Sequence, residues 1–320
     1  MDKSDFLPIR VSTLKGGVTL GFDIYIELPH KLLMYVRGNY DIEQHRIESL
    51  RSKKVRKLFI NEAAEESYQE YIDRCLSAVA EDPNMPPEEK TKMVVGAGEA
   101  TAERIYDNPE QIKSYRAAAN TSQNLLKVLK ANEDLLKNIF DHGDASENKD
   151  HDSLMHRHSV NTASLCISFA ESIGLPPEQV EALGIAGLYH DVAYGKSEPA
   201  VQELYFKPLS EMSLDEQKVY KQHPEQGKNF LVDKEFVSPL VLELIYSHEE
   251  KNQGNGFPQK LGSLNIGQEI ISICAYYDRA LTCLGHSRAD VFEAFSTNEL
   301  GNYNLETIKK FKSFIKKSGL

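Results

Sequence analysis

The apolar residues of this chain follow two different spacings, and the change between them restricts the fold more than any other feature. Near the N-terminus, short β-rich runs alternate with turn residues such as Lys15-Gly16-Gly17. From residue 86 onward, nearly all apolar residues recur at helical spacing. The pattern predicts strands at 6–14, 18–26, 31–36 and 55–60, and early helices at 41–51 and 65–79. The expected fold is therefore α+β overall, with a small N-terminal α/β module and a mostly α-helical bundle at the C-terminus.

Three parts are expected along the 320 residues, a length sufficient for about two domains. Residues 1–80 form the α/β module, residues 81–150 a helical connector, and residues 151–320 the helical domain. The last boundary lies in the segment His142–His151, which is polar and lacks periodicity. The connector helices could transmit a signal or form the seam of a homodimer, and packing inside one subunit is an equal alternative.

Composition excludes several classes of function. A net charge of −11 provides no global positive field for nucleic acid. The four cysteines form no Cys-x-x-Cys pair, which argues against a thiolate zinc site or a disulfide framework. No apolar run approaches the ~20 residues that span a bilayer, and the first residues lack the layout of a secretion signal. A cytoplasmic location is therefore expected.

Two predicted helices place a ligand-type side chain on their apolar face. His248 follows Val241 and Leu244 at the spacing of one helical stripe, so its imidazole is expected to point inward. Asp278 also lies in a stripe of apolar residues. A buried carboxylate without a partner is costly, so Asp278 requires one. A metal ion fits this need, and a salt bridge with Arg279 or another base is the alternative.

Four more ligand-type residues take inward or helix-end positions. His158 begins an apolar stripe, His190 and Asp191 end a helix, and His223 is expected at a helix C-terminus that Pro224 stops. Any single inward histidine is more often a hydrogen-bonded core residue, whereas the combination favours a shared metal site. Imidazole nitrogens together with carboxylate oxygens suit iron, manganese or zinc, whereas calcium prefers oxygens alone.

These residues fall within an ordered series of short motifs that covers about half of the chain. The motifs are Asp152-x5-His158-Ser159-Val160-Asn161, Ala186-Gly187-Leu188-Tyr189-His190-Asp191, His223-Pro224-Glu225-Gln226-Gly227, His248-Glu249-Glu250, Gly254-Asn255-Gly256-Phe257-Pro258 and Tyr303-Asn304-Leu305 with the helix to Phe311. In order and spacing the series resembles the HD-GYP group of the HD superfamily of metal-dependent phosphohydrolases.

The resemblance implies a helical bundle that holds two divalent metal ions, commonly iron or manganese, and hydrolyses the phosphodiester of cyclic di-GMP, a bacterial second messenger. Asp191 would bridge the two ions, and Lys196 would contact the phosphate during catalysis. The N-terminal module would recognise a signal or a protein partner. The implied metal ligands are His158, His190, Asp191, His223, His248 and Asp278, and the implied substrate-binding residues are Lys196, Gly256, Phe257 and Pro258.

The chain departs from the family pattern at several positions that bear on activity. Phe257 stands where the family has the tyrosine of Gly-Tyr-Pro, and Glu249 replaces the second histidine of a pair. The loop from Asp191 to Lys196 is two residues longer than usual. Ala275 occupies the place of the usual acidic ligand, for which Asp278 could substitute one turn later. Leu154 stands where some members carry a glutamate for a third metal.

Three functions follow from the resemblance and its departures. The first is a cyclic di-GMP phosphodiesterase of full or weak activity. The second is a degenerate signalling module that holds metal, with or without nucleotide, and lacks efficient turnover. The third is a metal-dependent hydrolase for another phosphoester.

Overall fold

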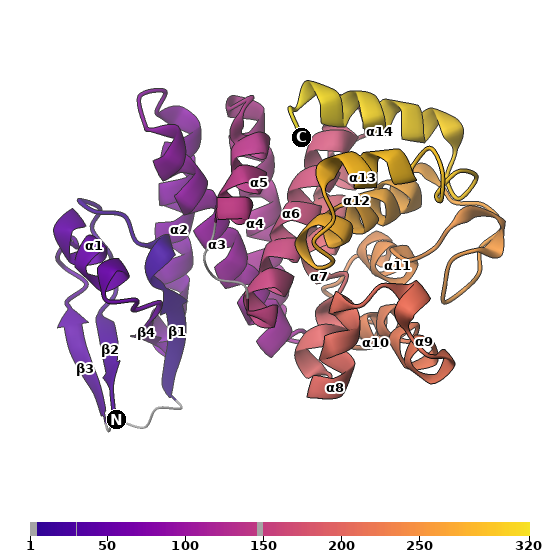
Figure 1. Ribbon diagram of the computed structural model, residues 1–320. Helices are drawn as coiled ribbons and strands as arrows, with labels where there is room; N and C mark the ends of the chain where they lie inside the picture. Colours follow the sequence, from indigo (N-terminus) through magenta and orange to yellow (C-terminus); the bar gives the residue numbers. More distant parts are fainter. Residues whose placement is uncertain (1–4, 30, 146–149) are drawn as a thin grey trace. The chain divides into compact units, whose positions relative to one another are not determined.

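The computed structural model describes residues 5–29, 31–145 and 150–320, and the chain divides into two compact units, Met1–Ala100 and Thr101–Leu320 (Figure 1). The expected connector, residues 81–150, is therefore shared between the two units. Residues 146–149 of the expected boundary lie outside the described residues. In the described parts of the chain, no helix is both long enough and apolar enough to cross a bilayer.

The N-terminal unit contains a four-stranded antiparallel sheet in the order β1-β4-β2-β3. This confirms the predicted α+β class and the number of strands. The second strand is shorter than predicted, because Gly21 takes a left-handed φ of 85° and turns the chain before β2 begins. The elements of this unit are β1 (Phe6–Arg10), β2 (Ile24–Leu28), β3 (Lys31–Val36), α1 (Gln44–Ser52), β4 (Lys57–Asn61), α2 (Glu65–Glu81) and the first part of α3 (Pro87–Asp107).

Helix α2 anchors the irregular chain that joins β1 to β2. The Tyr68 hydroxyl lies 2.9 Å from the Thr13 hydroxyl, and the Tyr71 hydroxyl accepts a hydrogen bond of 2.7 Å from the backbone N–H of Lys15. The ring of Phe22 packs edge-on against both tyrosines, with centroid distances of 5.5 and 5.6 Å. A buried helix face thus provides the polar partners that the connecting segment requires.

The second unit is helical, as predicted, and is organised around α6 (Figure 1). Helix α6 packs against α4, α7 and α12, and most of its residues between 155 and 170 are buried. A helix that is covered on all sides can direct polar groups only toward other buried elements. The further helices are α4 (Ile112–Ala131), α5 (Leu135–Ala145), α6 (His151–Ser172), α7 (Pro177–Tyr189), α8 (Pro199–Gln202), α9 (Leu214–Tyr220), α10 (His223–Asn229), α11 (Pro239–Ser247), α12 (Ile266–Thr282), α13 (Arg288–Ala294) and α14 (Leu305–Lys317).

Local sequence features explain where several of these helices begin. Ser213 and Glu216 form a capping box at the start of α9, and Pro177 is the first residue of α7. The predicted helix C-terminus at His223 is wrong: α9 ends at Tyr220, and His223 is the first residue of α10. Pro224 is accommodated because the first turn of a helix does not need the missing N–H.

The contact between α6 and α7 depends on a glycine. A Cβ atom added to Gly187 would lie 2.6 Å from the Cα atom of Ala163, which is closer than carbon atoms can approach. The backbones of the two helices can therefore approach this closely only without a side chain at position 187. This approach positions His190, three residues later, beside α6.

Substitution of Gly187 by valine is expected to force the two helices apart and to lower the free energy of unfolding by about 1–3 kcal/mol, the usual range for overpacking. Gly262→Val is the matched control, because nothing lies within 4 Å of a Cβ atom at that position. Urea unfolding followed by circular dichroism measures both. Equal destabilisation by the two substitutions would contradict the expectation.

Candidate metal centre

Five buried side chains from four helices meet in the second unit. His158 lies on α6, and His190 and Asp191 directly follow the last residue of α7. His223 begins α10, and His248 directly follows α11. Each of the five is at most 3% exposed. The structure thus brings together five of the six predicted metal ligands.

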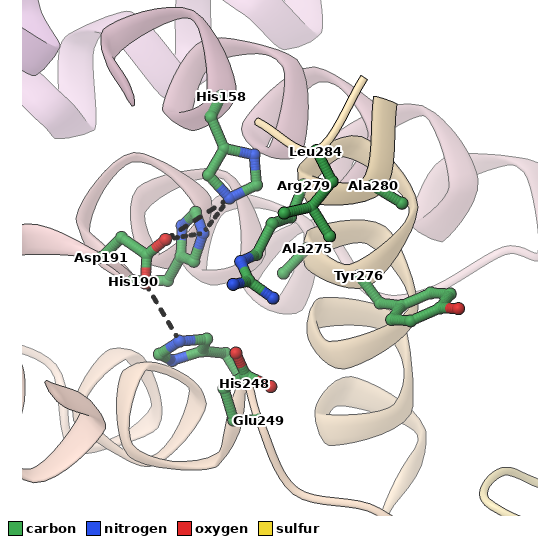
Figure 2. Close-up of a pocket in the computed structure, with 10 residues that line it drawn as sticks. All are labelled: His158, His190, Asp191, His248, Glu249, Ala275, Tyr276, Arg279, Ala280 and Leu284. Atoms are coloured by element: carbon green, nitrogen blue, oxygen red, sulfur yellow. Dashed lines mark hydrogen bonds and ion pairs between the residues drawn. The ribbon is translucent and has the colours of Figure 1, made fainter. Parts of the chain in front are cut away.

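Asp191 occupies the centre of this group. Its Oδ2 atom lies 3.5 Å from Nε2 of His158 and 3.5 Å from Nε2 of His190 (Figure 2). Its Oδ1 atom lies 3.2 Å from Nε2 of His223 and 3.4 Å from Nε2 of His248. Two groups of three potential ligands therefore share one carboxylate, with one oxygen directed to each group.

Backbone carbonyls set the tautomer of three imidazoles. Nδ1 of His190, His223 and His248 each lies 2.7–2.8 Å from the carbonyl oxygen three residues earlier. A carbonyl oxygen can only accept a hydrogen bond, so Nδ1 carries the proton in each ring. The Nε2 atom of the neutral ring then presents a lone pair toward Asp191. This is the form in which histidine binds a metal ion.

The spacing of these nitrogens fits a shared cation. Nε2 of His158 lies 2.9 Å from Nε2 of His190, and the same distance separates Nε2 of His223 from Nε2 of His248. Two nitrogens bound at right angles to one ion, each ~2.1 Å from it, would lie about 3.0 Å apart. Oδ1 of Asp191 is buried and makes no hydrogen bond within the described residues. The residues present therefore suit a divalent metal ion on each side of the carboxylate.

The electrostatics of the cluster indicate that it attracts cations. Burial opposes the charge of Asp191, yet the surrounding imidazoles, His190 first, hold the pKa of its carboxyl well below the usual range. Burial also opposes protonation of His158, but Asp191 and Asp278 outweigh it and raise the pKa of His158 to about 9. Burial lowers the pKa of His190 well below its usual value. A metal ion can therefore replace a proton that the cluster otherwise retains.

The structure places Asp278 on the Nδ1 side of His158. Its Oδ2 atom lies 2.7 Å from that nitrogen, and its Oδ1 atom accepts hydrogen bonds from Asn161 and Thr282 at 2.8 and 3.1 Å. Asp278 is thus outside both three-residue groups. The predicted alternative was a salt bridge with Arg279 or another base. Among the described residues Asp278 forms no ion pair with Arg279, and its basic partner is the His158 imidazole. Asn161 and Thr282 were not assigned a role from the sequence, although Asn161 lies one turn after His158 and Thr282 one turn after Asp278.

A cavity opens beside the cluster and exposes it to ligands. Six of its ten lining residues, among them Glu249, Ala275 and Arg279, are not among the predicted ligands (Figure 2). Oε1 of Glu249 accepts a hydrogen bond of 2.9 Å from the Tyr220 hydroxyl. Ala275, at the position of the usual family acid, contributes only a methyl group to the wall. The cavity is lined by His158, His190, Asp191, His248, Glu249, Ala275, Tyr276, Arg279, Ala280 and Leu284.

The structure does not bring Lys196 to this cavity. Its ammonium group donates a hydrogen bond of 2.6 Å to the backbone carbonyl of Asp107, and its side chain lines a separate hollow with Gln226 and Phe230. The longer loop that follows Asp191 forms a short 3₁₀ helix, Val192–Lys196, which directs the lysine away.

The loop that contains Gly256, Phe257 and Pro258 lies closer to the cluster. The ring centroid of Phe257 is 6.0 Å from that of His223, and its backbone N–H donates to the carbonyl of Glu249. The Glu250 carboxylate, which is fully buried, accepts hydrogen bonds from the backbone N–H groups of residues 259, 260 and 261. This carboxylate holds the loop in place beside His248.

A sequence profile for the HD domain matches residues 145–294. The whole chain also resembles the solved structure of Bd1817, an HDG"Y"P protein from Bdellovibrio bacteriovorus, with a TM-score of 0.74, 26% sequence identity, and coverage of 98% of this chain and 100% of that one. Residues 145–294 thus resemble the HD domain family, and the whole chain resembles a solved HD-GYP-type protein. This confirms the resemblance seen in the sequence motifs.

Two curated proteins share the HD domain. A cyclic di-GMP phosphodiesterase of Pseudomonas aeruginosa is 32% identical over 127 residues, which cover 40% of this chain and 28% of the relative. The 3'3'-cGAMP-specific phosphodiesterase 1 of Vibrio cholerae is 29% identical over 128 residues, which cover 39% of this chain and 28% of the relative. The aligned segments thus span about a quarter of each relative.

Replacement of Asp191 by asparagine is expected to remove most bound metal, because it takes away the single negative charge that both ligand groups share. Mass spectrometry of metals in the freshly purified protein measures the content. Asp233→Asn, at an exposed position, is the control and should retain metal. Full metal content in a folded Asp191→Asn variant would contradict the assignment of this carboxylate.

Replacement of Asp278 by asparagine tests its position behind His158. If Asp278 orients the imidazole, the affinity for manganese should fall roughly 10- to 100-fold, the usual loss when a residue that hydrogen-bonds to a metal ligand is replaced. The number of ions bound per chain should not change. Competition titration with a chelating dye measures both quantities. Loss of one full metal equivalent would instead show that Asp278 binds the ion directly.

Proposed function

We propose that this protein is a metal-dependent phosphodiesterase that hydrolyses cyclic di-GMP. The observation that supports this most directly is the Asp191 carboxylate, which lies between two pairs of imidazoles with one oxygen toward each pair. The presence of an HD domain supports the broader class, metal-dependent phosphohydrolase. One curated relative is named as a cyclic di-GMP phosphodiesterase, which supports the choice of substrate. The other is named for a different cyclic dinucleotide, 3'3'-cGAMP, and supports only the broader class of substrate.

Two divalent ions, iron or manganese, would occupy the site. His158, His190 and Oδ2 of Asp191 would hold one, and His223, His248 and Oδ1 of Asp191 the other. Bound ions of this kind supply Lewis acidity and lower the pKa of water, which produces a nucleophile at neutral pH. Mixed imidazole and carboxylate donors suit iron and manganese.

The remaining residues of the site orient the ligands and the substrate. Oδ2 of Asp278 would accept a hydrogen bond from the Nδ1–H group of His158, and Asn161 and Thr282 donate to its Oδ1, so this imidazole keeps a fixed direction. Gly256, Phe257 and Pro258 would line the approach to the metal centre. Phe257 offers an apolar ring for packing against a nucleobase but no hydroxyl donor.

A second candidate function, a signalling module that holds metal without efficient turnover, is favoured by the position of Lys196. The ammonium group expected at the phosphate is bonded to the Asp107 carbonyl. Glu249, in place of a second histidine, is bonded to Tyr220. In either function, the N-terminal unit would recognise a signal or a protein partner, and the protein could act as a homodimer.

The two functions differ in turnover. We expect manganese-loaded protein to convert cyclic di-GMP to a linear dinucleotide, and a chelator or Asp191→Asn to reduce the rate to background because both remove the ions that activate water. Separation of the nucleotides by liquid chromatography measures the product. Binding of cyclic di-GMP in calorimetry without product would support the signalling module instead.

A further inference from the structure

We propose that Arg279 binds the phosphate group of the substrate in this protein, the role that the family resemblance assigned to Lys196. The inference rests on the proposed function and adds to it, because it identifies the residue that recognises the anionic part of the ligand.

Arg279 lines the cavity that opens onto the metal centre. It lies on α12 one helical turn after Ala275, and both residues belong to the same wall. Its guanidinium group extends into the space between Asp191 and Glu249 (Figure 2). Among the ten residues that line this cavity, Arg279 is the one with a permanent positive charge.

The guanidinium is held by neutral groups. Its Nε atom donates to the backbone carbonyl of Tyr205 at 3.2 Å, and Nη2 donates to that of Lys207 at 3.0 Å. The centre of the guanidinium lies 5.0 Å from the centroid of the Tyr220 ring. These contacts use two of the five N–H donors and restrict the rotation of the side chain. The other donors can bind a ligand without first being ordered.

No carboxylate neutralises this charge through a salt bridge within the described part of the chain. Glu249 is nearby, but one of its oxygens already accepts from the Tyr220 hydroxyl. An aspartate at position 275 would stand four residues before Arg279, the spacing at which side chains on a helix form ion pairs. Ala275 leaves the guanidinium available. A half-buried cation without an ionic partner favours an anionic ligand.

A phosphodiester matches the available donors. A guanidinium group can give two parallel hydrogen bonds to two oxygens of one phosphate, which an ammonium group cannot do. Two other cations, Lys196 and Lys221, do not line this cavity. Lys196 donates to the carbonyl of Asp107, and Lys221 donates to Oε1 of Gln217 and lies 5.9 Å from the ring centroid of Phe257. The phosphate oxygens that do not face the ions would therefore bind Arg279.

The first experiment uses inorganic phosphate as the probe, so that it does not depend on the nucleotide. The wild-type protein, Arg279→Gln and Arg279→Lys are loaded with manganese, and metal content is measured before titration by calorimetry. We expect equal metal content and phosphate affinity roughly 10- to 100-fold weaker in Arg279→Gln, the loss typical of a charged hydrogen bond. Arg279→Lys should recover part of the affinity, because it keeps the charge but not the paired donors.

Arg288→Gln is the matched control, since Arg288 pairs with Asp141 and does not line the cavity. Its phosphate affinity should equal that of the wild type. Equal affinity in Arg279→Gln and the wild type would overturn the proposal. So would a larger loss in Lys196→Gln than in Arg279→Gln, or a metal-loaded wild type that binds no phosphate.

The second experiment repeats the comparison with cyclic di-GMP and separates this proposal from the proposed function. If the wild type hydrolyses the nucleotide, Arg279→Gln should raise KM by a factor similar to its loss of phosphate affinity. If phosphate binding depends on Arg279 but no linear product forms, the phosphodiesterase assignment fails and the role of Arg279 stands. An unchanged KM in Arg279→Gln, with product formed, would overturn the role of Arg279 alone.

Discussion

The structure of the helical unit depends on one buried carboxylate that faces four imidazoles. Asp191 is almost fully buried, and two Nε2 atoms lie within 3.5 Å of each of its oxygens. Its charge is tolerated there because a protonated imidazole or a bound metal ion can compensate it. A buried ionised carboxylate without such partners would be strongly destabilising. The helices α6, α7, α10 and α11 must therefore meet at this point. The close approach of α6 and α7 at Gly187 helps to satisfy that requirement.

Much of the convergence of the ligands could be predicted from the sequence, because the helical periodicity locates four of the five converging residues. His158 and His248 lie on apolar stripes, and His190 and Asp191 follow a clear helix end. The fold class was accessible for the same reason, since the change from strand to helical spacing is visible along the chain. The resemblance to the HD-GYP group then ordered these positions into one site.

Other features of the site could not be predicted, because they depend on contacts between residues that are far apart in the sequence or on local signals with two meanings. The partner of Asp278 could not be identified, because a buried acid on a helix face can bind a metal, a base or an imidazole with the same local sequence. The direction of Lys196 depends on a carbonyl of residue 107, which is 89 positions away. His223 was assigned to the wrong end of a helix, since proline is compatible both with the residue after a helix and with the first turn of the next. The domain limits at residues 80 and 150 remain predictions.

The imidazoles of the candidate metal centre are oriented in two different ways. His190, His223 and His248 each direct their Nδ1 proton to a carbonyl only three residues earlier, so their own turns determine the ring directions. His158 instead relies on Asp278, which is 120 residues away on α12. A small shift of α12 against α6 would thus rotate one imidazole and leave the other three unchanged. Since α12 also carries Arg279, such a shift would alter one metal position and the anion-binding group together, while the half around His223 and His248 stayed intact.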